Sequence, residues 1–140
     1  MRRENEKGQA MVEFALVLPI LILLVCGIID FGWIYSNQIT VTNACREAAR
    51  YSSVHLMDND GGDISGVEDD ARALVSQFAP MLESPTVTFE DPDNTSITSD
   101  SDTVKVTVSA QVPVLTGITS TFLGGNEVKV SAESTMKIEK

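Results

Sequence analysis

The longest hydrophobic segment lies near the start of the chain, where no residue from Phe14 to Ile29 carries a charge. Counted from Gln9, the segment has the ~20 residues that a helix needs to cross the hydrocarbon core of a bilayer. Pro19 lies inside it, and a proline removes a helix hydrogen bond and clashes with the preceding turn. The pattern therefore predicts a transmembrane helix with a kink at Pro19, near Ala15.

The helical pattern continues beyond the hydrophobic segment, because no proline or glycine interrupts the chain from Trp33 to Leu56. Apolar residues recur there at helical spacing, at Ile34, Val41, Ala44 and Ala48. We expect one long helix from about Gln9 to about His55, roughly 70 Å long at 1.5 Å per residue. Residues 9–35 are assigned to its transmembrane part and residues 36–56 to its exported part.

A second, shorter helix is predicted after a loop that is rich in Asp and Gly. Ser65 and Glu68 have the spacing of a capping box, in which two side chains satisfy free N–H groups at a helix start. Asp69 and Asp70 would then lie in the first turn, where negative charge is favourable, and Pro80 would end the helix. Its apolar face is predicted to consist of Val67, Ala71, Leu74, Val75 and Phe78.

The last part of the chain alternates between apolar and polar residues, which is typical of strands with one buried face. Alternation occurs at Val87 and Phe89, from Val104 to Val112 and from Val128 to Ile138. We expect a small antiparallel sheet covered by the two helices, so residues 57–140 are expected to form an α+β head domain. This arrangement resembles the head domains of pilins. The moderately apolar stretch 115–123, before a turn at residues 124–126, is expected to be a loop exposed to partners.

The charges around the hydrophobic segment predict its orientation. Arg2, Arg3 and Lys7 precede it and Asp30 follows it. The positive-inside rule then places residues 1–8 in the cytoplasm and everything after Asp30 outside. Trp33 and Tyr35 would lie in the outer aromatic belt. The chain is thus expected to be a single-pass protein of the inner (cytoplasmic) membrane with an extracytoplasmic C-terminal domain.

A cleaved secretory signal peptide is the alternative to this anchor, since it also combines a basic start with an apolar core. No clean small-x-small cleavage site ends the apolar run, where Val25, Cys26 and Gly27 precede Ile28. The helical pattern also continues past the run. We therefore favour a retained anchor.

Composition argues against several classes of function. The chain has 20 acidic and 10 basic residues, a formal net charge of -10, so nucleic acid is not an expected partner. His55 is the only histidine, and no P-loop, GxGxxG or CxxC motif occurs. Cys26 and Cys45 would be roughly 28 Å apart on one helix, too far to pair within the chain. We expect no enzyme, no catalytic residues and no cofactor.

An acidic cluster of Asp58, Asp60 and Asp63 is the one candidate for a calcium site. An EF-hand loop needs a ligand at position five and glycine at position six, whereas Gly62 and Asp63 stand in the reverse order. The twelfth position is Asp69 instead of glutamate. A solvated acidic turn without metal is the better interpretation.

Glu13 is the only charged residue between Gly8 and Ile29. Placing an ionised carboxylate in hydrocarbon costs about 2.5–3.5 kcal/mol, so such a residue indicates a function. A glycine that closes a polar leader, with a glutamate five residues later, resembles the processing site of type IV prepilins. The resemblance implies cleavage after Gly8, a new N-terminus at Gln9, and an assembly role in which the Glu13 carboxylate compensates the Gln9 α-amine of a neighbouring subunit.

Further motifs make the resemblance more specific. They are Glu13-Phe14-Ala15, the run from Leu16 to Pro19, the pair Gly27 and Asp30, and the run from Arg46 to Arg50. Together they resemble the TadE-like family over residues 8–51. The resemblance implies a minor pilin or pseudopilin of the tight-adherence (Flp) pilus system, which serves adhesion to surfaces. Its expected partners are a prepilin peptidase, other pilus or pseudopilin subunits, the assembly platform and the membrane.

Two other interpretations remain open. One is a single-span membrane-anchored extracytoplasmic binding module, which would keep its leader. The other is a main structural pilin, which would build filaments by itself.

Overall fold

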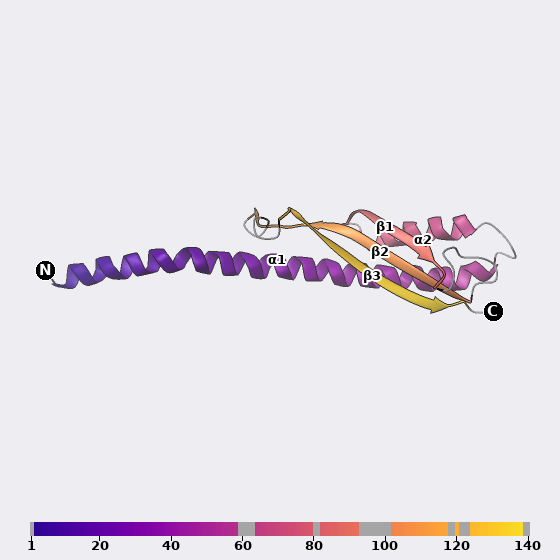
Figure 1. The fold of residues 1–140 in the computed structure, drawn as a ribbon, viewed down its shortest axis with the longest axis horizontal. Helices are drawn as coiled ribbons and strands as arrows, with labels where there is room; N and C mark the ends of the chain where they lie inside the picture. Colours follow the sequence, from indigo (N-terminus) through magenta and orange to yellow (C-terminus); the bar gives the residue numbers. More distant parts are fainter. Residues whose placement is uncertain are drawn as a thin grey trace.

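The computed structural model describes residues 2–58, 64–79, 82–92, 102–117, 120 and 124–138. Its elements are α1 (Arg2–Asp58), α2 (Ile64–Phe78), β1 (Glu83–Glu90), β2 (Thr103–Pro113) and β3 (Glu127–Lys137). The sheet and α2 lie along the C-terminal half of α1, while the N-terminal half projects away from them (Figure 1). The predicted α+β fold, with one long helix, a shorter helix and an antiparallel sheet, is confirmed.

Helix α1 is longer than the sequence pattern indicates. It begins at Arg2 instead of Gln9 and ends at Asp58 instead of His55. The leader extends the helix because Arg, Glu and Lys have high helix propensity and no proline interrupts them. Helical structure continues on both sides of Pro19, and the kink at this residue stays a prediction.

The three strands form one antiparallel sheet in the order β1-β2-β3. Central strand β2 places Val106 opposite Phe89 of β1 and Ser134 of β3. The register shifts between Glu83 and Thr86, where Pro85 lacks the N–H that a regular ladder needs. The period-two alternation of β2 is confirmed, since its apolar side chains are buried: Val104, Val106, Val108, Ala110 and Val112.

The hydrophobic core lies between the buried face of this sheet and the C-terminal half of α1. The α1 side chains in the core are small or β-branched: Val41, Ala44, Cys45, Ala48 and Ala49. Helix α2 packs beside α1 and adds Val67, Ala71 and Val75. Alanines on α1 allow the sheet to approach the helix backbone closely, so valines from β2 fill the remaining volume.

The start of α2 differs from the prediction. The helix begins at Ile64, so Ser65 lies inside its first turn. No acidic residue lies in that turn, and Asp69 and Asp70 come later in the helix. The predicted place of Asp69 and Asp70 in the first turn was therefore wrong, because the helix starts one residue before its expected cap. The capping box of Ser65 and Glu68 stays a prediction.

The acidic residues of α2 have side-chain partners instead. Arg72 bonds to Glu68 at 3.2 Å and to Asp69 at 3.0 Å, while Tyr51 of α1 donates its hydroxyl to Asp70 at 3.1 Å. The hydrogen bond to Asp70 raises the pKa of Tyr51. Because these pairs are exposed, each contributes little to stability, but the Tyr51–Asp70 bond joins α2 to α1.

Cys45 illustrates how closely the sheet lies on α1. Its thiol Sγ lies 3.2 Å from the Val106 carbonyl oxygen and 3.4 Å from that of Ala132. The residue is buried, and burial raises the pKa of the Cys45 thiol. A buried thiol with a raised pKa has little of the thiolate form that reacts with electrophiles.

Cys45 is therefore expected to resist alkylation while the head is folded. In a Cys26→Ala variant, iodoacetamide at neutral pH should leave the intact mass unchanged, and denaturant should allow addition of one group. The matched Cys45→Ala variant reports on Cys26 alone. Rapid labelling of Cys45 without denaturant would show that the sheet separates from α1 under native conditions.

Candidate functional site

The predicted processing residues lie on the free N-terminal part of α1. A Cβ added at Gly8 would meet no described atom outside its own stretch of helix within 4 Å, so the described residues leave this position uncovered. Gln9 and Glu13 are one helical turn apart, and the Gln9 side-chain amide donates to Glu13 Oε1 at 3.2 Å. The structure thus brings Gln9 and Glu13 together, while Pro19 lies further along the same exposed stretch.

This part of α1 has the dimensions of a membrane anchor. Every residue from Lys7 to Val25 is exposed, so none of these side chains is covered by the described head. The stretch extends about 28 Å at 1.5 Å per residue, close to the ~30 Å hydrocarbon thickness of a bilayer. By length and composition, α1 is also the single helix in the described chain that qualifies as a membrane span. One apolar N-terminal helix therefore fits a single-pass anchor.

The first buried residue after this stretch is Asp30, which is 2% exposed. Its carboxylate accepts two hydrogen bonds from Thr116, which follows β2. The Thr116 backbone N–H donates to Oδ1 at 2.9 Å, and the Thr116 hydroxyl donates to Oδ2. Charge-assisted hydrogen bonds compensate for removing a carboxylate from water. We call this contact the Asp30–Thr116 clip.

Sequence reasoning missed the clip. Asp30 was predicted only to mark the outer end of the membrane segment. The two residues are 86 positions apart, and no local pattern connects them. The sequence signal that could have pointed to Asp30 was a carboxylate directly after an apolar run.

The aromatic residues next to Asp30 separate onto two sides of α1. Tyr35 is exposed and stacks on Phe31 with ring centroids 6.3 Å apart. Trp33, expected beside Tyr35 in an aromatic belt, instead packs against the core with its indole Nε1 buried. The difference arises because the face of α1 that carries Asp30 and Trp33 is the face that the sheet covers.

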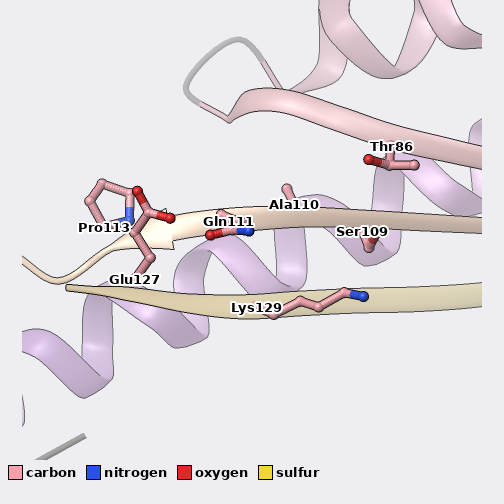
Figure 2. A pocket seen from close by; sticks show the side chains of 7 residues that line it. All are labelled: Thr86, Ser109, Ala110, Gln111, Pro113, Glu127 and Lys129. Atoms are coloured by element: carbon pink, nitrogen blue, oxygen red, sulfur yellow. The ribbon is translucent and has the colours of Figure 1, made fainter. Parts of the chain in front are cut away.

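The outer face of the sheet carries an open hollow of about 410 Å³ near the β1 irregularity (Figure 2). It is lined by Thr86, Ser109, Ala110, Gln111, Pro113, Glu127 and Lys129. The strand register places Gln111 opposite Lys129 and Ser109 opposite Thr86. These side chains can donate and accept hydrogen bonds, but they include no histidine or cysteine.

Other candidate chemistry is sparse in the described residues. No group of three or more His, Cys, Asp or Glu side chains there is placed to hold a metal ion. Asp60 and Asp63 of the acidic cluster lie outside the described residues, as does the side chain of Asp58. His55 contacts its own helix, with Nδ1 3.0 Å from the Tyr51 carbonyl oxygen and its ring stacked on that of Tyr51.

The N-terminal part of α1, which contains the predicted processing residues, matches a known protein family. The model of the TadE-like protein family matches residues 8–50. No curated protein and no solved structure matches the chain. The matched segment includes Gly8, Glu13, Pro19 and Asp30 and extends through the part of α1 that supports the sheet. The resemblance predicted from the sequence is confirmed, since residues 8–50 match the TadE-like protein family.

Proposed function

We propose that this chain is a TadE-like minor pilin, or pseudopilin, that a prepilin peptidase cuts after Gly8 and that then takes part in assembly of a Tad (Flp) pilus. The proposal rests on two features that begin at the same place in the chain. The family match begins at Gly8, the residue after which cleavage is proposed, and a free helix as long as a bilayer is thick follows it. In this proposal the chain is a substrate and a structural subunit, with no catalytic role and no cofactor.

The local structure around Gly8 supports cleavage there. A peptidase binds its substrate in an extended conformation, so the helix must open at the bond that is cut. Glycine inside a helix is less stable than alanine by about 1 kcal/mol, which makes Gly8 a favourable place to open it. No described side chain covers this residue. In the proposed orientation residues 1–8 lie in the cytoplasm and the head lies outside.

The arrangement of α1 supports a role as a subunit among others. The head covers one face of its C-terminal half and leaves the opposite face free. Apolar side chains exposed on that face recur at helical spacing: Leu24, Ile28, Phe31, Tyr35 and Ile39. They continue the apolar surface of the anchor beyond Asp30. We assign this stripe to packing against other pilus or pseudopilin subunits and the assembly platform.

A membrane-anchored binding module is the second candidate, and the polar hollow on the sheet favours it (Figure 2). Its hydrogen-bonding side chains suit a small polar ligand. The hollow is open to solvent, however, and ligand sites usually bury most of their ligand. This candidate also gives no reason for a glycine and a glutamate at the positions of Gly8 and Glu13.

The deciding measurement is the intact mass of the membrane-bound chain, expressed with and without its cognate prepilin peptidase. We expect loss of residues 1–8 from the parent only when the peptidase is present. Gly8→Arg should keep the leader, because a long charged side chain would occupy the space beside the bond that the peptidase cuts. Gly66→Arg, the same change at an exposed helical position of the head, is the matched control and should be cut like the parent. A parent that keeps its leader beside an active peptidase would favour the binding module.

A further inference from the structure

The connection between β2 and β3 reaches the point where the free part of α1 ends. Its described residues, Val114–Gly117, Ser120 and Gly124–Asn126, are called the β2–β3 tip. The Val114 N–H donates to the Asn126 carbonyl oxygen at 2.8 Å and closes the tip. Gly124 has a φ of 74°, which glycine adopts without strain. The end of β2 and the start of β3 lie on the side of the sheet nearest the N-terminal half of α1 (Figure 1).

The position of the tip along the axis of α1 follows from the point at which the side chains of α1 become buried. On the face of α1 towards the sheet, side chains are exposed up to Val25, half-buried at Cys26 and buried at Asp30, where the Asp30–Thr116 clip holds the tip. On the opposite face Ile28 and Ile29 stay exposed. Val25 and Asp30 are about 7.5 Å apart along the helix axis. A bilayer has roughly 5–7 Å of headgroup region on each side of its hydrocarbon core. If the hydrocarbon ends near Val25, the tip lies at the level of the outer headgroups.

The chemistry of the tip suits that level. Residues 114–126 include no charged side chain, although charged residues make up 21% of the chain. Leu115, next to Thr116 of the clip, is 56% exposed. Exposing this apolar side chain is unfavourable in water and favourable at a lipid surface. The exposed side chain of Asn126 can hydrogen-bond to headgroups. The net charge of -10 opposes binding to anionic lipid, so neutral headgroups are the matching partner.

We propose that the β2–β3 tip rests in the outer headgroup layer of the bilayer, with Leu115 inserted between neutral lipid headgroups. The exported part is then held at the membrane by two points, α1 and the tip, and the Asp30–Thr116 clip sets the angle between them. This inference rests on the membrane anchoring in the proposed function. It adds that extraction of the subunit from the bilayer must also release the head from the lipid surface.

The test uses single tryptophans in the full chain, reconstituted into phosphatidylcholine vesicles with or without brominated acyl chains. Trp33→Phe removes the native fluorophore and loses no hydrogen bond, because Trp33 Nε1 has no partner among the described residues. Leu115→Trp then reports on the tip. Thr135→Trp is the matched control on an exposed position of β3, remote from the tip, and Leu18→Trp reports on the anchor.

We expect blue-shifted emission and bromine quenching for Trp at positions 115 and 18, and unshifted, unquenched emission at position 135. Quenching at 18 but not at 115 would overturn the proposal and leave the anchor intact. Absence of quenching at 18 would overturn the anchoring itself, and the proposal with it. Quenching at both 115 and 135 would show that the sheet lies flat on lipid, which also contradicts contact through the tip alone. Circular dichroism of each variant verifies its fold.

Discussion

Replacing Thr116 with valine is expected to lower the free energy of unfolding of the exported part by about 1.5–3 kcal/mol, the usual contribution of a hydrogen bond to a charged group. Valine has nearly the shape of threonine, so the substitution removes the hydroxyl donor and little volume. Asp30 is 2% exposed, so water cannot readily replace the hydroxyl that its Oδ2 accepts. The carboxylate would keep the bond from the Thr116 backbone N–H.

The measurement is urea unfolding of the full chain in detergent micelles, followed by the emission of Trp33, the only tryptophan, which packs against the core. Thr116→Ser keeps the hydroxyl and should recover most of the loss. Thr135→Val makes the same change on an exposed position of β3 and should stay within about 0.5 kcal/mol of the parent. If Thr116→Val unfolds like the parent, packing and not the clip holds the tip on α1.

The elements of this fold could be predicted from sequence because their patterns are local. The strict alternation from Val104 to Val112 predicts a strand with one buried face, and β2 has that face under α1. The small residues around Ala48 recur at helical spacing on the face of α1 that the sheet covers. Each pattern repeats within a few residues, so it is visible without knowledge of the rest of the chain.

The differences arise where a contact over a long sequence distance decides the outcome. Trp33 and Tyr35 are two positions apart, yet only Trp33 faces the sheet, and the sheet is formed by residues 50 or more positions later. The Asp30–Thr116 clip depends on the same packing. The start of α2 at Ile64 is a smaller error of one residue, within the usual uncertainty of helix ends.

The residues of the candidate site also differ in whether a local sequence pattern could predict them. Gly8 and Glu13 were found from a motif, and their proposed roles concern other molecules. The fold of this chain therefore adds only their accessibility and the contact between Gln9 and Glu13. The tip could not be found from its own sequence, because its position beside the anchor depends on Asp30.

Glu13→Ala is expected to leave membrane insertion and cleavage intact and to reduce incorporation into the pilus by roughly 100-fold. Side chains on a helix lean towards its N-terminus, so the Glu13 carboxylate lies over the turn that begins at Gln9. After cleavage, Gln9 would carry a charged α-amine in the membrane. An unpaired charge there costs about 2.5–3.5 kcal/mol, and a carboxylate partner relieves the cost for both groups.

Removal of the carboxylate makes the anchor more apolar, so insertion is favoured while the amine of a neighbouring subunit loses its partner. Glu13→Gln separates charge from hydrogen bonding, because it keeps the size and the acceptor oxygen but not the charge, and it should fail like alanine. Glu13→Asp keeps the charge on a shorter side chain and should retain part of the incorporation. Intact mass verifies cleavage of every variant, and the amount of the chain in sheared pili measures incorporation. If Glu13→Ala were cleaved and incorporated at the parent level, charge pairing would be excluded, and Glu13 would serve only to reach the headgroups at the edge of the membrane.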